Sequence, residues 1–195
     1  MFNTTIATQI YAKICFEATN SQKKIIENLS EYLSDDDFSR IFVLNGFAGT
    51  GKTTLIAALV AALKELRIKP VLLAPTGRAA KVLARYCGEQ ALTIHKRIYR
   101  QRTNADYESK FSLDFNREQG AVFIVDEASM LSDSTGDGAL FGSGSLLEDL
   151  VSYVRSGRSC RLILVGDSAQ LPPVGCDFSP ALDPATVSRY GEVVY

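Results

Sequence analysis

The chain has 195 residues, which is enough for one domain with a hydrophobic core and short for two. Its composition, with 46% apolar and 22% charged residues, excludes a fibrous or wholly disordered chain. The net charge of −1 leaves a nucleic-acid partner open, because lysines and arginines nearly balance the carboxylates over the whole sequence.

Helices and strands are predicted to alternate along most of the chain. The first helix follows a capping box at Thr19 and Gln22 and ends at the aspartate run of residues 35–37. Four apolar runs too short for helices predict strands at residues 41–44, 71–74, 121–125 and 161–165. Further helices are predicted at residues 55–66, 77–87 and 146–155. Strands that are apolar on both faces and alternate with helices indicate an α/β fold, with a parallel sheet covered on both sides.

Two polar segments fall outside this alternation. Residues 97–120 carry several aromatic residues, which either stack on a base or close a short hairpin around residues 110–115. Residues 132–145 have the glycine- and serine-rich composition of a flexible surface loop. We therefore expect one domain over residues 1–195, with one inserted segment at about 97–120 and one flexible loop at about 132–145.

The turn after the first predicted strand fits the phosphate-loop pattern, from Gly46 to Thr53. Its glycines let backbone N–H groups turn toward a phosphate at the positive end of the following helix. Lys52 would bring a charge to the β- and γ-phosphates, and the Thr53 hydroxyl would bind Mg²⁺. A purely structural glycine turn would explain the glycines but not Lys52 and Thr53.

Two adjacent acids, Asp126 and Glu127, follow the third predicted strand. Asp126 suits the shell of Mg²⁺, which prefers oxygen ligands, and Glu127 suits the orientation or deprotonation of an attacking water. The same pair could instead begin a helix. With a phosphate loop in the same chain, the acids favour hydrolysis over transfer of a phosphoryl group to a bound acceptor.

The remaining features bear on partners and location. Between residues 78 and 102 the chain has seven basic residues and one acid, which indicates an anion-binding surface or two solvated helix faces. The four cysteines lack the paired spacing of a zinc site and predict reduced thiols in a cytoplasmic protein. No membrane partner is expected, because the longest apolar run is about half as long as a bilayer requires.

Five segments together resemble the superfamily 1 DNA helicases, and most closely the RecD-like branch. They are the phosphate loop and residues 74–81 (APTGRAAK), 93–96 (TIHK), 126–130 (DEASM) and 166–175 (GDSAQLPPVG). The resemblance implies a RecA-like P-loop NTPase domain that uses ATP and Mg²⁺ and moves along single-stranded DNA, with 5′ to 3′ polarity. It also implies that residues 97–120 form a short pin-like insertion.

The resemblance implies roles for particular residues. Gln22 would contact the adenine, although the capping box explains it equally well, and Asp167 and Gln170 would link the γ-phosphate to the metal site. The implied catalytic residues are Lys52, Asp126, Glu127 and Gln170, and the metal ligands are Thr53 and Asp126. The implied nucleotide-binding residues are Gln22, Gly46, Ala48, Gly49, Thr50, Gly51, Lys52, Thr53, Thr54 and Asp167. The implied contacts to the DNA backbone are Pro75, Thr76, Gly77, Arg78, Thr93 and His95.

The family's motor has a second RecA-like domain that supplies an arginine to the transferring phosphate, and we expect this sequence to lack it. Such an arginine contributes about three to five orders of magnitude in rate, so the chain alone should hydrolyse ATP very slowly. Two alternatives remain open at this stage. One is a P-loop ATPase or kinase that does not act on nucleic acid, and the other is a nucleotide-binding scaffold without catalysis.

Overall fold

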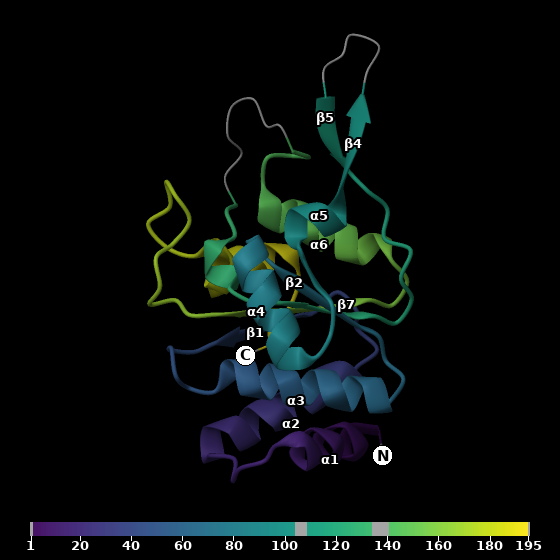
Figure 1. Cartoon of the computed structure of the whole chain (residues 1–195), viewed down its shortest axis with the longest axis vertical. Coiled ribbons are helices and arrows are strands. Elements are labelled where there is room, and N and C mark those ends of the chain that lie inside the picture. Colours follow the sequence, from purple (N-terminus) through teal and green to yellow (C-terminus); the bar gives the residue numbers. More distant parts are fainter. Residues whose placement is uncertain (1, 104–108, 134–140, 195) are drawn as a thin grey trace.

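A six-stranded sheet forms the centre of the protein (Figure 1). The computed structural model describes the backbone of residues 2–103, 109–133 and 141–194. The strand order is β3-β2-β6-β7-β1-β8, and every neighbouring pair is parallel. The strands are β1 (Ile41–Asn45), β2 (Pro70–Ala74), β3 (Ala91–Thr93), β6 (Val122–Val125), β7 (Arg161–Gly166) and β8 (Val193–Val194). Because all strands are parallel, their carboxyl ends lie at one edge of the sheet.

Helices cover both faces of the sheet, as the apolar strands predicted. One face packs against α1 (Phe2–Lys13), α2 (Asn20–Ser34), α3 (Lys52–Glu65) and α4 (Gly77–Cys87). The other face packs against α5 (Ile94–Ile98) and α6 (Leu146–Ser156). Figure 1 shows the two helical layers on opposite sides of the strands. The predicted α/β class is therefore confirmed.

Alternation along the strands explains the two apolar cores. On β1, Phe42 and Leu44 face the layer of α1 to α4, whereas Ile41 and Val43 face the layer of α5 and α6. Successive side chains of a strand point to opposite faces, so a strand buried on both sides must be apolar at every position. This is why β1, β6 and β7 could be predicted from continuous apolar runs.

Several elements were not predicted, among them α1, α5, β3 and β8. Helix α1 carries only Ile6 and Ile10 into the core among its described side chains, so its apolar periodicity is weak. Strand β3 has three residues and pairs with β2, and strand β8 has two residues and pairs with β1. Their extended form depends on this pairing. Short edge strands carry too few residues for a pattern in the sequence.

A hairpin of β4 (Tyr99–Thr103) and β5 (Ser109–Leu113) projects away from the sheet (Figure 1). It lies within the predicted insertion of residues 97–120, and it starts earlier than the residues 110–115 suggested for a hairpin. The intervening residues 104–108 lie outside the described part of the chain. The hairpin runs antiparallel, with Tyr99 opposite Leu113 and Gln101 opposite Phe111.

The end of the glycine-rich segment, residues 141–145, makes specific contacts in the structure. Phe141 pairs with Phe111 of the hairpin through an isolated bridge, and Ser145 is buried and caps α6 by accepting a hydrogen bond from Glu148 N. The flexibility predicted for this segment stays a prediction. Residues 134–140 lie outside the described residues, so the prediction is untested there.

Short elements complete the chain after β7. They are the 3-10 helices Pro180–Leu182 and Ser188–Tyr190 and the helix α7 (Pro184–Val187), while the 3-10 helix Ala128–Met130 follows β6. Within the described ranges, none of the helices has the length and apolar character needed to cross a bilayer.

Candidate nucleotide and nucleic-acid site

A cavity of about 430 Å³ opens at the carboxyl edge of the sheet and is called the phosphate cavity below. Its walls come from the turn after β1 and from the ends of β6 and β7. Most of the predicted nucleotide and catalytic residues line it: Ala48, Gly49, Gly51, Lys52, Thr53, Thr54, Asp126, Glu127, Asp167 and Gln170. The structure thus brings together three motifs that are far apart in the sequence.

The phosphate loop reverses direction through two glycines in the left-handed region. Gly49 has φ 79° and Gly51 has φ 85°, values that a side chain would strain. Helix α3 starts directly afterwards at Lys52, so its first free N–H groups face the loop. The Lys52 ammonium donates to the carbonyls of Gly46 and of Phe47, the latter at 2.8 Å. A lysine held on the loop in this way can exchange carbonyl oxygens for phosphate oxygens.

Asp126 and Glu127 both line the phosphate cavity, and their negative charges repel each other. Burial raises the pKa of Asp126, while the Glu127 N–H that donates to its Oδ1 at 3.0 Å and the charge of Lys52 both act against that rise. Burial and then repulsion by Asp126 raise the pKa of Glu127. Glu127 also has φ 54°, a left-handed conformation that costs on the order of 1 kcal/mol outside glycine. Strain and desolvated charge at one residue are typical of a functional site.

The turn after β7 is tied to the turn after β1. Gly46 N donates to Gly166 O at 3.1 Å, and Ser168 N donates to Asn45 Oδ1 at 3.0 Å. Asp167 is buried and accepts from Ala169 N at 2.9 Å, which is the local hydrogen bonding expected of a tight turn. Gln170 is exposed and lines the phosphate cavity. The turn therefore holds itself together and still presents Gln170 to the phosphate loop.

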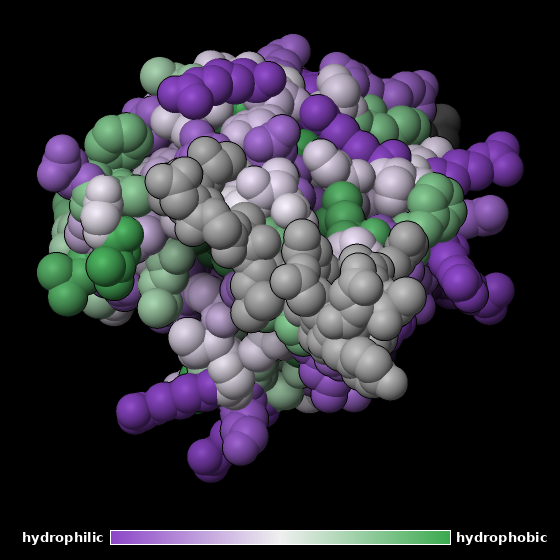
Figure 2. Space-filling view, turned by 90° about the horizontal axis from the view of Figure 1, so that it is seen from above, coloured by the Kyte–Doolittle hydropathy of each residue, from purple (hydrophilic) through white to green (hydrophobic). Residues whose placement is uncertain are grey.

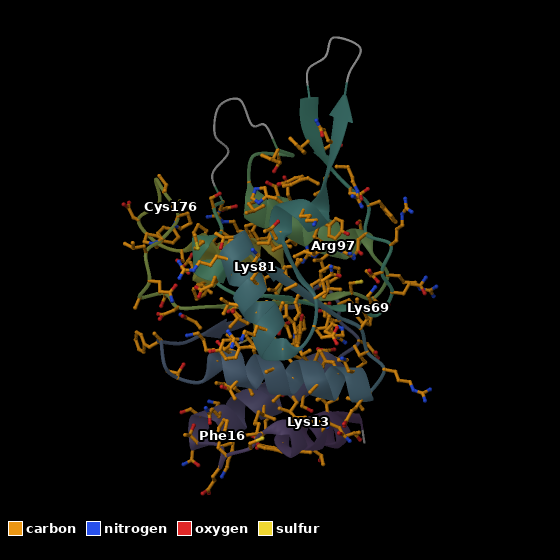
Figure 3. All side chains as sticks on the ribbon, in the orientation of Figure 1. Lys13, Phe16, Lys69, Lys81, Arg97 and Cys176 are labelled. Atoms are coloured by element: carbon orange, nitrogen blue, oxygen red, sulfur yellow. The ribbon has the colours of Figure 1, made fainter. Side chains whose placement is uncertain are left out.

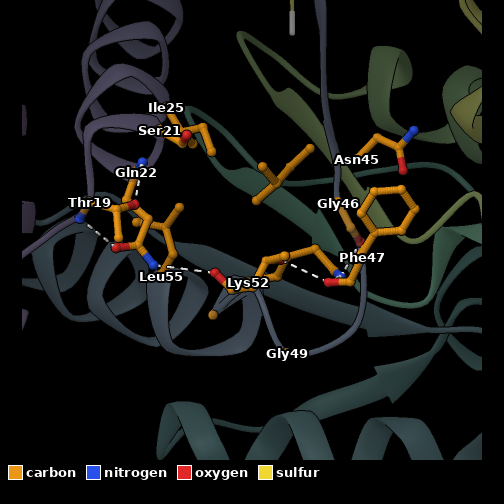
Figure 4. A pocket seen from close by; sticks show the side chains of 13 residues that line it. Thr19, Ser21, Gln22, Ile25, Asn45, Gly46, Phe47, Gly49, Lys52 and Leu55 are labelled. Carbon is orange, nitrogen blue, oxygen red and sulfur yellow. Dashed lines mark hydrogen bonds between the residues drawn. The ribbon is translucent and has the colours of Figure 1, made fainter.

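A second cavity of about 600 Å³ lies between α2 and the phosphate loop (Figure 4). Gln22 forms the predicted capping box, in which its Oε1 accepts from Thr19 N at 3.0 Å. Its Nε2 donates to Thr50 O at 3.3 Å, so the same side chain reaches the phosphate loop. The capping role is confirmed, and an adenine contact remains a prediction. Gly46 and Thr50, the other predicted nucleotide residues, also line this cavity.

The donor set of the phosphate cavity suits Mg²⁺. Thr53 and Asp126 offer hard oxygen atoms in the same cavity, and a cation there would relieve the repulsion between Asp126 and Glu127. The described residues contain no cluster of three or more metal-binding acids, histidines or cysteines.

The two predicted DNA-contacting segments follow neighbouring strands. Ala74 at the end of β2 is opposite Thr93 at the end of β3. Thr76 caps α4 by accepting from Ala79 N, and Thr93 caps α5 by accepting from Lys96 N, both at 3.2 Å. Each hydroxyl hydrogen is still able to donate to a phosphate oxygen, because capping uses only the acceptor.

The other predicted DNA contacts differ in exposure. Gly77 and Arg78 are exposed at the start of α4, and Pro75 is half-buried beside them. His95 is half-buried, and its ring packs against Tyr99 and Phe141 with centroid distances of 5.6 and 5.0 Å. The structure therefore gives His95 a packing role, and its contact with DNA stays a prediction.

The basic segment is only partly available to an anion. Arg97 pairs with Glu118 and Arg100 pairs with Asp114, each at 2.7 Å. Lys69 reaches the same Glu118 carboxylate, and Figure 3 shows Lys69 and Arg97 on the same side of the protein. Four bases have no ion pair within the described part of the chain and are exposed: Arg78, Lys81, Arg85 and Lys96. The free positive charge thus belongs mainly to α4.

Sequence reasoning missed two residues of the site. Tyr86, an exposed residue of α4, lines the phosphate cavity although it lies far from every phosphate motif in the sequence. Asn45 ends β1 and joins the two turns through Ser168. A polar residue at the end of an otherwise apolar strand was the available signal for Asn45. Nothing in the sequence pointed to Tyr86, because only the packing of α4 beside α3 brings it there.

The loop after β7 carries exposed apolar side chains. Leu171 is 87% exposed, Val174 is 102% exposed and Phe178 is 55% exposed. Seen from above in Figure 2, apolar surface gathers at the left margin, the side to which this loop projects in Figure 1. Large apolar groups that remain in water at the edge of a site are typical of a surface that another domain or protein covers.

Comparison with known proteins agrees with this geometry. A sequence profile described as an AAA domain matches residues 17–177, a range that includes every residue of the phosphate cavity. The chain belongs to the AAA domain family. This assignment and the relatives below confirm the resemblance to RecD-like helicases.

Several relatives of this AAA domain are named helicases or helicase subunits. The ATP-dependent RecD2 DNA helicase of Deinococcus radiodurans is 30% identical over 154 residues, which is 79% of this chain and 19% of the relative. The RecD subunit of the RecBCD enzyme from Mycobacterium tuberculosis is 35% identical over 69% of this chain and 24% of the relative. The ATP-dependent DNA helicase dda of phage T4 is 34% identical over 67% of this chain and 28% of the relative. The chain therefore spans less than a third of the length of each of these proteins.

Proposed function

We propose that this AAA domain is the ATP-binding domain of an ATP-dependent, RecD-like DNA helicase that moves along single-stranded DNA. One observation carries the proposal. The carboxyl edge of a single sheet holds a phosphate cavity with Lys52, Asp126 and Glu127, and the two predicted DNA-contacting segments end neighbouring strands at the same edge. Changes in the cavity are therefore linked to those segments through strands that hydrogen-bond to each other.

The cavity residues divide the work of hydrolysis by their chemistry. Lys52 would bind phosphate oxygens, and Thr53 and Asp126 would hold Mg²⁺, which supplies positive charge against the phosphates when bound. Glu127, with its raised pKa, is suited to accept a hydrogen bond or a proton from the attacking water. Gln170, which lines the phosphate cavity, would contact the γ-phosphate, and Gln22, which lines the second cavity, would contact the adenine.

Binding to DNA would be independent of base sequence. The hydroxyls of Thr76 and Thr93 and the charges of Arg78 and Lys81 recognise phosphate oxygens, which carry no sequence information. A motor that must cross any sequence requires contacts of this kind. The polarity of movement, 5′ to 3′, enters the proposal through the resemblance to RecD-like helicases alone.

A second RecA-like domain belongs to the proposal as well. The relatives are several times longer than the match, and the exposed Leu171, Val174 and Phe178 lie beside the turn that presents Gln170. We expect that domain to cover these side chains and supply an arginine, so the 195 residues alone should turn over ATP slowly and unwind nothing. A cytoplasmic location is also proposed, and it is supported by four free cysteines.

Binding measurements on the 195-residue chain test the proposal. Calorimetry with Mg²⁺ and ATP should give saturable binding, and a fluorescent oligo(dT) should bind with an affinity that falls steeply with salt, as phosphate contacts require. Arg78→Ala with Lys81→Ala should weaken oligo(dT) without changing ATP affinity. Lys24→Ala, an exposed lysine of α2, is the matched control and should change neither. Binding of ATP with no binding of oligo(dT) at low salt would overturn the helicase assignment and favour a P-loop ATPase or kinase that does not act on nucleic acid.

A further inference from the structure

Four aromatic rings join the projecting hairpin to the body of the protein. Phe111 of β5 stacks on Phe141 with a centroid distance of 4.5 Å, and Phe141 also contacts Tyr99 at 5.3 Å. Phe141 meets the ring of His95 edge-on at 5.0 Å. Phe141 therefore touches each of the other three rings, which come from α5 and from both strands of the hairpin.

The backbone beside Phe141 is fixed by a buried carboxylate of α6. Asp149 accepts hydrogen bonds from the Tyr99 hydroxyl at 2.6 Å and from Ser143 N at 3.0 Å. Gly142 lies between them with φ 46°, and a Cβ on it would overlap Asp149 Oδ2 and fall 2.7 Å from the Tyr99 ring. The absence of a side chain at residue 142 is thus required by close contacts on two sides.

The same segment extends the hairpin's hydrogen bonding. Gly142 N donates to Phe111 O at 2.9 Å, next to the bridge between Phe111 and Phe141. A two-stranded hairpin is marginally stable in water, so β4 and β5 depend on contacts at their base to hold one orientation. Phe141, Gly142, Ser143 and Asp149, called the hairpin clamp below, supply those contacts from outside the hairpin.

We propose that Phe141 and Asp149 are positioning residues that fix the β4–β5 hairpin and the His95-bearing helix α5 as one rigid unit on the DNA-facing side. Movement of the hairpin is then transmitted to α5. The N-cap of α5, Thr93, is also the last residue of β3, which pairs with β2. The part of this proposal that concerns DNA rests on the proposed helicase function. The mechanical part, that the clamp orients hairpin and α5 together, does not.

The single histidine of the chain makes the clamp directly measurable. His95 is the only histidine, so its ring protons form one resolved set of signals in proton NMR. Burial lowers the pKa of His95 in the intact protein. Loss of the Phe141 ring would admit water to the imidazole and move its pKa upward, toward the ordinary value.

The experiment compares Phe141→Ala and the milder Phe141→Leu with Phe16→Ala, which removes an equally large but 44% exposed ring between α1 and α2. Phe141→Ala should raise the pKa of His95 and accelerate hydrogen exchange of the β4–β5 amides at least tenfold, with Phe141→Leu between it and wild type. ATP affinity should stay within twofold, which also shows that each variant is folded. Phe141→Tyr, which keeps the ring, should restore wild-type behaviour, and Phe16→Ala should match wild type throughout.

Three results would separate the clamp from the proposed function. An unchanged His95 titration and unchanged hairpin exchange in folded Phe141→Ala would overturn the clamp, whatever the protein does with DNA. If the clamp holds and the wild type binds oligo(dT), Phe141→Ala should weaken that binding at least fivefold, and equal affinity would overturn its role in positioning DNA contacts. If the wild type does not bind oligo(dT), the helicase assignment fails while the titration still decides the clamp.

Discussion

The phosphate cavity and the hairpin clamp are built in opposite ways. In the cavity, Asp126 and Glu127 repel each other, both have raised pKa values, and Glu127 adopts a strained backbone. In the clamp, the buried Asp149 carboxylate has hydrogen-bond donors and Phe141 stacks on Phe111. The cavity keeps unfavourable charge that a ligand would relieve, whereas the clamp is satisfied within the fold. Substitutions in the cavity should therefore reduce binding while sparing or improving stability, and those in the clamp should reduce stability.

The largest expected effect is on nucleotide binding. Lys52→Ala removes the only side-chain cation among the described residues that line the phosphate cavity, and its loss should weaken ATP binding by about 1.5–3 kcal/mol, or roughly 10- to 150-fold. The melting temperature should fall only slightly, because Lys52 donates to loop carbonyls and its charge offsets those of Asp126 and Glu127 only in part. Calorimetry and thermal denaturation measure the two quantities. Equal ATP affinity in wild type and variant would refute the assignment of the loop.

A substitution in the hairpin clamp should lower the stability of the fold instead of ATP binding. Tyr99→Phe removes the hydroxyl that donates to Asp149 and leaves a buried carboxylate with one partner fewer, at a cost of about 1–3 kcal/mol of unfolding free energy. Denaturant titration checks this value. Tyr86→Phe is the matched control, since its hydroxyl is on an exposed residue and its removal should cost less than about 0.5 kcal/mol. Equal stability of the two variants would show that the clamp contributes nothing to the fold.

A smaller effect of opposite sign is expected at Glu127. Glu127→Gln removes a desolvated negative charge beside Asp126 and should stabilise the fold by less than about 1 kcal/mol, because solvent screens the partly exposed carboxylate. The same change should abolish the hydrolysis that a complete motor would show. A lower melting temperature for Glu127→Gln than for wild type would contradict the prediction that the charge of Glu127 destabilises the folded state.

The smallest expected effect is that the added stability of Glu127→Gln depends on pH. Because the pKa of Glu127 is raised on folding, its ionised form destabilises the native state above that raised pKa. As the pH falls through the raised pKa and below the ordinary value of 4.5, Glu127 becomes protonated in both the folded and unfolded states, and the stability advantage of the Glu127→Gln variant over wild type should vanish. Melting curves of wild type and variant between neutral and acidic pH measure this convergence. A constant difference across that range would mean that the charge is not its source.

Much of the central fold could be predicted because its signals are local. The strand β7 is a continuous apolar run, and helix α4 begins at the cap Thr76 and ends at Gly88, which has φ 63° as a terminating glycine requires. The cavity was predictable for a related reason: a phosphate loop and an acidic pair at the ends of parallel strands must meet at one edge. Spacing and strand direction were enough.

The clamp could not be predicted, because it consists of contacts between residues that are far apart in the sequence. Residues 141–145 have the composition of a linker. Glycine is nevertheless required at position 142 because a side chain there would overlap Asp149. Tyr99 and Asp149 are fifty positions apart, and nothing in either neighbourhood signals their pairing. Composition reports what a segment contains, but steric fit between distant segments becomes visible only after folding.

The outer strand β8 bears on where this domain can be cut. The family match ends at residue 177, but Ile41 N donates to Glu192 O and β8 completes the sheet beside β1. A recombinant fragment trimmed to residues 17–177 would lack both this strand and helix α1, leaving the hydrogen-bonding groups of β1 open to other chains. Such a fragment should aggregate during purification, so expression boundaries are better set by the sheet than by sequence similarity.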